Sequence, residues 1–271
     1  MSDIVSSLHI SNLFNTSQVD IASLIEKSLL QILIILELLI IFYVIMKTLR
    51  TVRFIVANKK LIRDSFSFEA SPKVVTSHVV LFGDSTAYGT GSLDPHLSVA
   101  GRLSTDYPHA HIDNKAANGE QIHDVAQKMN EGGEQFYDLA IVLIGGNDVI
   151  FLTPRKTIVH NLEIVLAKAK KMTNNNVILV SPMNVGASRM FWFPIDIFYD
   201  WRSKTIRKIF RSVSKKHDVP LVDLYIPRPF DFLAEYPKLY FANDHIHYNG
   251  EGYGYIYEEI KEVIQMNSML K

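Results

Sequence analysis

The feature that most constrains this chain is an apolar stretch near its N-terminus, SLLQILIILELLIIFYVIM, which only Ser28, Gln31 and Glu37 interrupt. As a helix rising 1.5 Å per residue it would span about 28 Å, close to the hydrocarbon core of a bilayer. No small-residue cleavage site follows it, and it is longer than the apolar core of a signal peptide. The sequence therefore predicts an N-terminal tail at residues 1–27 and an uncleaved transmembrane anchor at residues 28–46.

Two other interpretations of the stretch are a buried helix of a soluble protein and a helix lying in the membrane interface. An interfacial helix has a strongly polar face, whereas residues 28–46 are apolar nearly all round. Glu37 near the middle costs on the order of 3 kcal/mol on insertion scales, which the surrounding Leu and Ile residues offset. The spanning interpretation is therefore preferred.

Basic residues flank this stretch unevenly, because Lys27 alone precedes it whereas several follow it. Those that follow are Lys47, Arg50, Arg53, Lys59, Lys60 and Arg63. The positive-inside rule then predicts that the C-terminal part of the chain lies on the cytoplasmic side of a membrane. The basic residues either lie along anionic lipid or simply anchor the end of the helix. Residues 47–75 are thus predicted to be a basic juxtamembrane segment and linker.

Beyond residue 75, short apolar runs alternate with segments of helical periodicity. Predicted strands lie at 79–82, near Ile112, and at 139–144, 177–180 and 220–224, and predicted helices lie around 97–103, 122–129, 158–172, 206–213 and 256–264. Alternation of this kind predicts parallel β–α–β units, with a sheet covered by helices on both faces. Residues 76–271 are therefore predicted to form an α/β domain, whose ligands bind beyond the carboxyl ends of the strands.

Composition excludes several classes of function. Lys and Arg together number 28 and are balanced by 28 Asp and Glu, which argues against a general nucleic-acid binder. The chain has no cysteine, which excludes disulfides, a thiolate nucleophile and cysteine-ligated metal sites.

A serine follows the first predicted strand, in the sequence Gly83-Asp84-Ser85-Thr86. At a strand-to-helix turn Ser85 could be a nucleophile near helix N–H groups, or it could simply cap the helix. The second glycine of the α/β-hydrolase nucleophile elbow is missing, since Ala87 stands at its position.

Two further strand ends carry groups that can stabilise negative charge. Gly119 lets a backbone N–H approach a substrate, although it could be an ordinary turn glycine. The third predicted strand ends in Gly145-Gly146-Asn147-Asp148, where the side-chain amide of Asn147 is a suitable oxyanion donor or part of a polar turn.

The last predicted strand is followed by Asn243-Asp244-His245-Ile246-His247-Tyr248. A loop of this size lets the carboxylate of Asp244 reach one ring nitrogen of His247 and leaves the other nitrogen as a base for Ser85. A metal site at Asp244, His245 and His247 is the alternative, but no further ligand cluster accompanies it, so neither a metal nor another cofactor is expected.

These motifs, in this order over roughly 76–271, resemble those of the SGNH, or GDSL-type, hydrolase family. The resemblance implies a flavodoxin-like three-layer α/β/α domain with Ser85 as nucleophile. It implies Asp244 and His247 as the other catalytic residues, and an oxyanion hole formed by Ser85, Gly119 and Asn147. Thr86 stands where leucine is usual and Tyr248 where proline often follows the histidine, which puts the pocket floor and the loop that presents His247 in question.

The predicted function is therefore hydrolysis of acyl esters by a membrane-anchored serine hydrolase. An aromatic stretch at 190–201 contains both tryptophans and either packs as a helix or contacts lipid. With the anchor it favours a lipid-like ester or lysophospholipid as substrate, and membrane lipid as a partner of the N-terminal helix. The alternatives are an acetyl esterase of small or sugar esters, an acyltransferase, and a non-catalytic membrane-tethered binding protein on the same fold.

Overall fold

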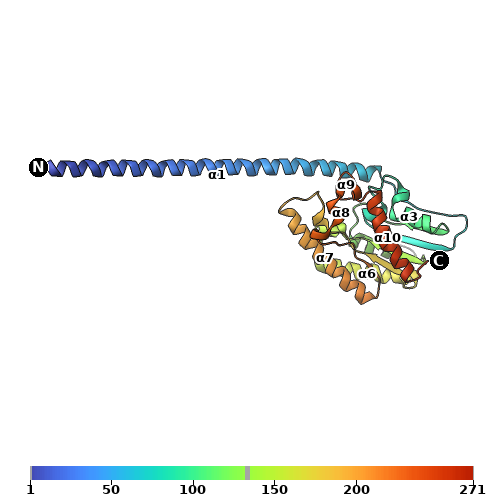
Figure 1. Ribbon diagram of the computed structural model, residues 1–271. Helices are drawn as coiled ribbons and strands as arrows, with labels where there is room; N and C mark the ends of the chain where they lie inside the picture. The colour runs from blue at the N-terminus through green and yellow to red at the C-terminus, as the bar shows by residue number, and fades with distance from the viewer. Residues whose placement is uncertain (1, 132–134, 271) are drawn as a thin grey trace. The chain divides into compact units, whose positions relative to one another are not determined.

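The computed structural model describes residues 2–131 and 135–270 (Figure 1). The chain divides into two compact units, the first ending at Val52 and the second beginning at Arg53.

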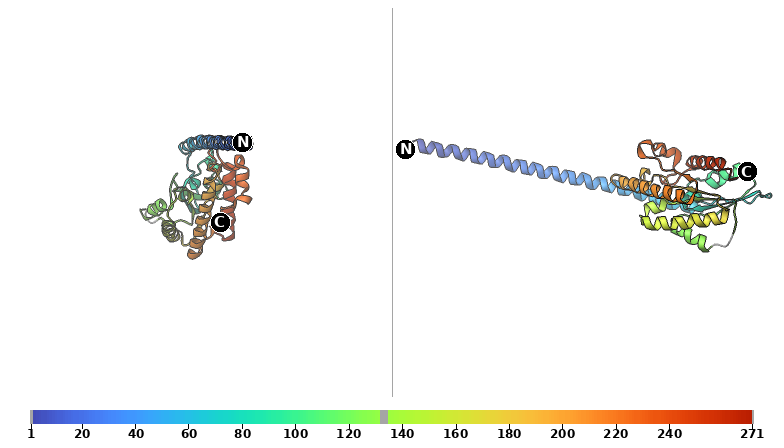
Figure 2. Two further views of the ribbon diagram at one scale, coloured as in Figure 1. Left: turned by 90° about the vertical axis from the view of Figure 1, so that its left-hand side faces the viewer. Right: turned by 90° about the horizontal axis from the view of Figure 1, so that it is seen from below.

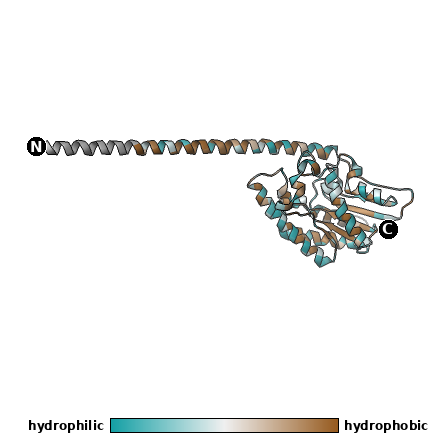
Figure 3. Cartoon of the chain, in the orientation of Figure 1, coloured by the Kyte–Doolittle hydropathy of each residue, from teal (hydrophilic) through white to brown (hydrophobic). Residues whose placement is uncertain are grey.

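The first element is a long helix, α1 (Ser2–Asp64). Within it, the segment Ile21–Asp64 is long and apolar enough to cross a membrane, and none of its apolar window is buried within the protein. Figure 3 shows this window as a nearly continuous hydrophobic band, after which polar residues become frequent. The interpretation as a buried core helix is therefore wrong. The helix does not end with the apolar stretch but continues through the basic segment that follows it.

A parallel sheet of five strands forms the centre of the second unit, in the order β2-β1-β3-β4-β5. The strands are β1 (Ser77–Gly83), β2 (Ala110–Asn114), β3 (Leu139–Leu143), β4 (Val177–Val180) and β5 (Leu221–Val222). Each predicted strand is present, but β5 is shorter than the predicted 220–224. Pro220 has no N–H to donate to a ladder, and the carboxylate of Asp223 binds Arg207 and Arg211 on the neighbouring helix α7.

Helices connect the strands, and the predicted helical segments all lie in helices. These are α2 (Ser85–Tyr88), α3 (Val99–Asp106), α4 (Ile122–Glu131), α5 (Gly146–Ile150), α6 (Arg155–Thr173), α7 (Ile195–His217), α8 (Phe232–Glu235), α9 (Pro237–Tyr240) and α10 (Gly250–Met266). The start of α3 lies later than predicted. Pro95–Leu97 forms a separate 3₁₀ turn, and the hydroxyl of Ser98 then caps α3 by accepting the N–H of Gly101.

The helices lie on both faces of the sheet (Figures 1 and 2). Alternate side chains of β1 separate the two halves of the core. Val79 and Leu81 pack with residues of α3 and α10, and Val80 and Phe82 pack with residues of α4, α6 and α7. The structure therefore confirms the predicted three-layer α/β/α architecture, which brings the carboxyl ends of all the strands to the same edge of the sheet.

Candidate active site

The turn after β1 exposes Ser85 because two neighbouring residues shape the backbone. Gly83 has φ of +149°, and a Cβ there would lie only 1.8 Å from the carbonyl oxygen of Leu143 in β3. Asp84 then caps α2, its carboxylate accepting the N–H of Thr86 at 2.9 Å. Because Asp84 caps the helix, the alternative role of Ser85 as a helix cap is wrong, and the Ser85 hydroxyl is available for other contacts.

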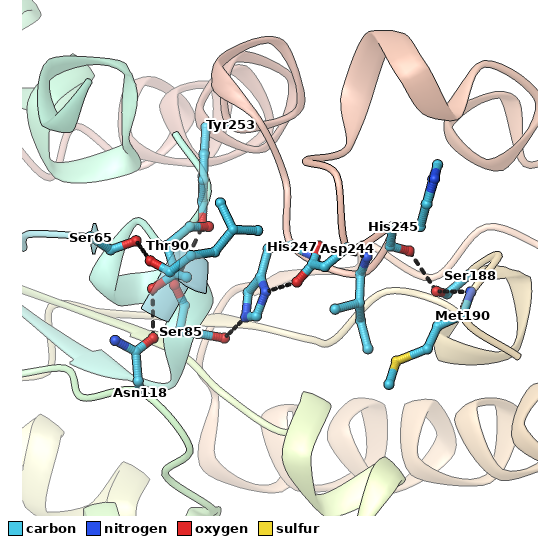
Figure 4. A network of polar contacts seen from close by, with 12 residues as sticks. Ser65, Ser85, Thr90, Asn118, Ser188, Met190, Asp244, His245, His247 and Tyr253 are labelled. Atoms are coloured by element: carbon cyan, nitrogen blue, oxygen red, sulfur yellow. Dashed lines mark hydrogen bonds and ion pairs between the residues drawn. The ribbon is translucent and has the colours of Figure 1, made fainter. Parts of the chain in front are cut away.

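Ser85, His247 and Asp244 form a continuous chain of hydrogen bonds (Figure 4). Oγ of Ser85 lies 2.8 Å from Nε2 of His247, and Nδ1 of His247 lies 2.6 Å from Oδ2 of Asp244. The Asp244 carboxylate is fully buried, and the His247 side chain is only 10% exposed. The structure thus brings together the three residues that the sequence singled out for nucleophile, base and orienting carboxylate.

Asp244 is held as a carboxylate in spite of its burial. Burial raises its pKa, but the hydrogen bond and charge of His247 and the backbone N–H groups of Ile246 and His247 lower it more. Those two N–H groups each donate to Oδ1 at 3.1 Å, while Oδ2 faces the imidazole. The net pKa of Asp244 lies below its ordinary value, so this carboxylate is charged at neutral pH and favours the Nδ1–H tautomer of His247.

The loop that presents His247 is held by packing and hydrogen bonds. The ring of Tyr248 is buried and stacks on Phe241 at 5.1 Å between ring centroids. The carbonyl of His245 accepts the hydroxyl of Ser188 at 2.6 Å, and His245 itself has a left-handed φ of +59°. Tyr248 therefore fixes the loop at the position where family members often have proline.

The oxyanion residues predicted from the sequence lie on two further strand ends. Asn147 is in α5, directly after β3, and lines the same cavity as Ser85 and His247. Its Nδ2 donates one N–H to the carbonyl of Glu120 at 2.9 Å. Gly119 has φ of +86°, and a Cβ there would meet nothing within 4 Å, so its surroundings are open.

The loop before Gly119 is fixed close to Ser85. The N–H of Ala117 donates to the carbonyl of Gly83 at 3.1 Å. The side-chain oxygen of Asn118 accepts the hydroxyl of Thr90 at 2.5 Å. Residues on both sides of Ser85 therefore hold the Gly119 loop.

Sequence reasoning missed two buried residues that support the site. The Tyr253 hydroxyl donates to the carbonyls of Thr90, at 2.8 Å, and Ser85, at 3.3 Å (Figure 4). Asp84 was seen only as part of a motif, but burial raises its pKa to about 6, even though the Thr86 N–H and hydroxyl, the charge of His247 and the Gly146 N–H oppose the shift. No periodicity signals either role, because Tyr253 belongs to a helical face that also packs against the core.

A cavity of about 100 Å³ opens beside the Ser85 hydroxyl. Apolar side chains from the strand ends and the segments after them form most of its wall: Leu143, Ile144, Ile150, Val180, Pro182, Met183, Val185, Leu224 and Ile246. Asn58 lines the cavity too, although it belongs to α1 and no sequence motif indicated it. Among the described residues, no group of His, Asp or Glu side chains is arranged to hold a metal ion.

Solved structures of similar fold include a lipase/acylhydrolase from Enterococcus faecalis, with a TM-score of 0.53 and 20% identity over 70% of this chain and 96% of that one. An acetyl xylan esterase, AlAXEase, has a TM-score of 0.53 and 19% identity over 69% of this chain and 99% of its own. TesA has a TM-score of 0.52 and 18% identity over 71% of this chain and 99% of its own. At these identities the likeness concerns the fold.

Comparison with curated proteins finds no significant match. The model of the GDSL-like lipase/acylhydrolase family matches residues 81–255, which include the nucleophile motif and the Asp244–His247 loop. This match covers more than half of the chain. The chain therefore belongs to the GDSL-like lipase/acylhydrolase family, a family of ester hydrolases.

Proposed function

We propose that this protein is a membrane-anchored serine hydrolase that cleaves carboxylic esters through an acyl-enzyme. The observation that carries the proposal is the pair of hydrogen bonds that join Ser85 Oγ to His247 at 2.8 Å and His247 to Asp244 at 2.6 Å. A serine hydroxyl is a poor nucleophile unless a base removes its proton, and this arrangement provides the base.

In the first half of the reaction, Ser85 Oγ attacks the ester carbonyl while His247 Nε2 takes its proton. The C–O bond to the alcohol then breaks, and His247 gives the proton to the departing oxygen. In the second half, His247 takes a proton from water, the hydroxide attacks the acyl-enzyme, and the bond to Ser85 breaks with return of the proton. Asp244 keeps the imidazole oriented and stabilises its charged form.

The negative charge that develops on the carbonyl oxygen is assigned to three donors, the backbone N–H groups of Ser85 and Gly119 and the side-chain amide of Asn147. Asn147 is suited to this role because it lines the cavity and is held by Glu120 through one of its two N–H bonds. A donor fixed before the reaction stabilises charge without having to reorganise.

A lipid-like ester is the proposed class of substrate. The cavity wall is mostly apolar, and α1 contains a segment able to cross a membrane. The start of α7 adds exposed aromatic side chains, with Phe193 64%, Phe198 44% and Trp201 52% exposed. Aromatic rings of this kind are enriched at membrane interfaces. The excess of basic residues after the apolar stretch favours the cytoplasmic side for the catalytic domain.

The volume of the cavity favours a second candidate, a short-chain or acetyl ester of a small alcohol or sugar. About 100 Å³ is less than the roughly 150 Å³ of an engineered protein cavity that holds benzene. A long acyl chain would therefore have to extend through the open side of the cavity.

Replacing Ser85 by alanine tests the catalytic proposal. We expect Ser85→Ala to lose hydrolysis of p-nitrophenyl butyrate and labelling by a fluorophosphonate probe, because both need the serine oxygen. Ser212→Ala, which removes an exposed serine from α7, is the control and should keep both. Labelling that persists in Ser85→Ala would remove Ser85 from the mechanism, and a wild-type protein that is neither labelled nor active would favour the non-catalytic binding protein.

A panel of esters from acetate to palmitate, assayed with the full chain in detergent, tests the substrate class. Strict preference for acetate would defeat the lipid-like ester, whereas rates that rise with chain length would support it. Addition of an alcohol acceptor, with analysis for the transesterified product, distinguishes an acyltransferase from a hydrolase.

A further inference from the structure

The last turns of α1, from Arg53 to Asp64, pack against the catalytic domain and belong to the same compact unit. One side of these turns is partly buried, at Phe54, Ala57, Asn58 and Leu61, with the spacing of one helical face. Lysines and arginines occupy the exposed side. The family match begins at residue 81, so this packed segment is an addition that the family pattern does not account for.

This helix end contacts the chain on both sides of the catalytic hydrogen bonds. The ring of Phe54 meets the ring of His245 edge-on, with centroids 4.8 Å apart, in the loop that presents His247. Just beyond the helix, the carbonyl of Ser65 accepts the hydroxyl of Tyr88, in the helix that begins with Ser85, at 3.5 Å. The end of α1 is therefore positioned by both of the segments that carry reacting groups.

Asn58 reaches the catalytic cavity from this helix, and it lines the cavity together with Ser85 and His247. Its amide makes no hydrogen bond with any described residue, whereas other polar side chains of the cavity have partners. The Ser181 hydroxyl accepts the N–H of Leu224 at 3.1 Å, and the Asn147 amide donates to a backbone carbonyl. Asn58 therefore presents an amide that can both donate to and accept from a ligand.

We propose that Asn58 is a substrate-binding residue that hydrogen-bonds a polar group on the alcohol part of the ester. This inference rests on the proposed function, because it assigns one side of the substrate of that reaction. The apolar walls come from the ends of the sheet strands and suit the acyl chain. Asn58 comes from a helix outside the sheet, on the side from which the alcohol enters and through which it leaves after acylation. An alcohol that carries further hydroxyl groups, as in a glyceryl or sugar ester, is the chemistry that this amide recognises.

Two esters that share an acyl group test this assignment in the full chain in detergent. Glyceryl monobutyrate has hydroxyl groups on its alcohol part, and ethyl butyrate has none, but both form the same butyryl-enzyme. We expect Asn58→Leu to lower kcat/KM for the glyceryl ester by about threefold to tenfold, the worth of one hydrogen bond, and to leave the ethyl ester within about twofold. Deacylation, which is common to both, should not change.

Two further variants serve as controls. Lys60→Leu introduces the same side chain on the exposed side of the same helix and should change neither ester. Asn58→Gln keeps an amide and should recover part of the loss. The rate of fluorophosphonate labelling of Asn58→Leu, which needs no polar alcohol group, should match that of the wild-type protein and shows that the catalytic residues remain assembled.

An equal loss for both esters would make Asn58 a structural residue, and no loss for either would remove it from the substrate site. Either result overturns the inference while leaving ester hydrolysis by the wild-type protein intact. If the wild-type protein hydrolyses neither ester and Ser85 does not react with the probe, it is the proposed function that fails.

Discussion

The carboxylate of Asp244 lies 2.6 Å from Nδ1 of His247 and is closed off from solvent, so the orientation of the imidazole depends on this one contact. Replacing Asp244 by asparagine keeps the shape but can present an N–H to Nδ1, which would favour the wrong tautomer. We expect Asp244→Asn to lower kcat for p-nitrophenyl butyrate by about 10⁴-fold, as in other serine hydrolases. Asp218→Asn changes an exposed aspartate in a left-handed turn that asparagine tolerates, and it should retain full activity. Near-normal turnover of Asp244→Asn would contradict the assigned role.

Asn147 should affect the rate of the chemical step more than substrate binding. We expect Asn147→Ala to lower kcat by about 10²–10³-fold with little change in KM, because an oxyanion donor acts mainly in the transition state. Asn161→Ala is the matched control, since Asn161 also donates its amide to a backbone carbonyl, that of Thr157, but lies in α6. A variant of Asn147 that changes only KM would assign this amide to ground-state binding.

Asp84 should make the stability of the catalytic domain depend on pH. Its pKa is about 6 in the folded protein and 3.8 in the reference state, so the folded protein holds this proton more tightly. The stability from this group is fully present below pH 3.8 and is lost as the pH rises through about 6. Relative to the wild-type protein, Asp84→Asn should therefore gain on the order of 3 kcal/mol in unfolding free energy between pH 4 and pH 7.

Denaturant titrations monitored by tryptophan fluorescence at several pH values measure this difference. Any loss of contacts in Asp84→Asn shifts the whole curve by a constant, so only the slope of the difference reports on the carboxyl group. Asp218→Asn again serves as the control. A difference between wild type and Asp84→Asn that does not vary with pH would show that Asp84 ionises normally.

Two glycines with positive φ should respond very differently to alanine. At Gly83 a Cβ would overlap the carbonyl of Leu143 at 1.8 Å, so Gly83→Ala must separate β1 from β3 and should prevent stable folding. At Gly119 a Cβ meets nothing, so Gly119→Ala should cost only the backbone strain of about 1–2 kcal/mol. Thermal unfolding of the two variants compares these costs. A Gly83→Ala protein as stable as Gly119→Ala would contradict the close approach of the strands.

Two buried tyrosines should respond in opposite ways to loss of their hydroxyl groups. The Tyr248 hydroxyl has no hydrogen-bond partner among the described residues, so Tyr248→Phe should be neutral or stabilising and should keep the stacking on Phe241. Tyr253→Phe leaves the carbonyl of Thr90 without a donor and should cost about 1–3 kcal/mol. Thermal unfolding of both variants measures the difference. A larger loss in Tyr248→Phe than in Tyr253→Phe would be inconsistent with these hydrogen bonds.

Much of the fold was predictable because each strand is a short, continuous apolar run and each helix has a clear repeat. Buried strands such as Val177–Val180 appear at the predicted positions. The placement of Ser85, Asn147 and His247 near one cavity followed from the rule that parallel strands end at one edge of a sheet.

What could not be predicted depends on contacts between distant residues. The bonds of Tyr253 to Thr90 and Ser85 join segments more than a hundred and fifty residues apart and leave no local pattern. The burial that shifts the pKa of Asp84 arises from packing around the strand end. The face of α1 that includes Phe54 and Asn58 has a helical spacing, but it lies among lysines and arginines that suggested contact with lipid headgroups.

The strand order has a consequence for synthesis of the protein. The strand that leads to Ser85, β1, emerges from the ribosome first among the strands but lies between β2 and β3 in the finished sheet. Its two apolar faces and both of its hydrogen-bonding edges therefore stay unpartnered until residues up to Leu143 have been translated. A nascent chain paused before that point would expose an aggregation-prone segment, which makes the early part of this domain a natural client for chaperones.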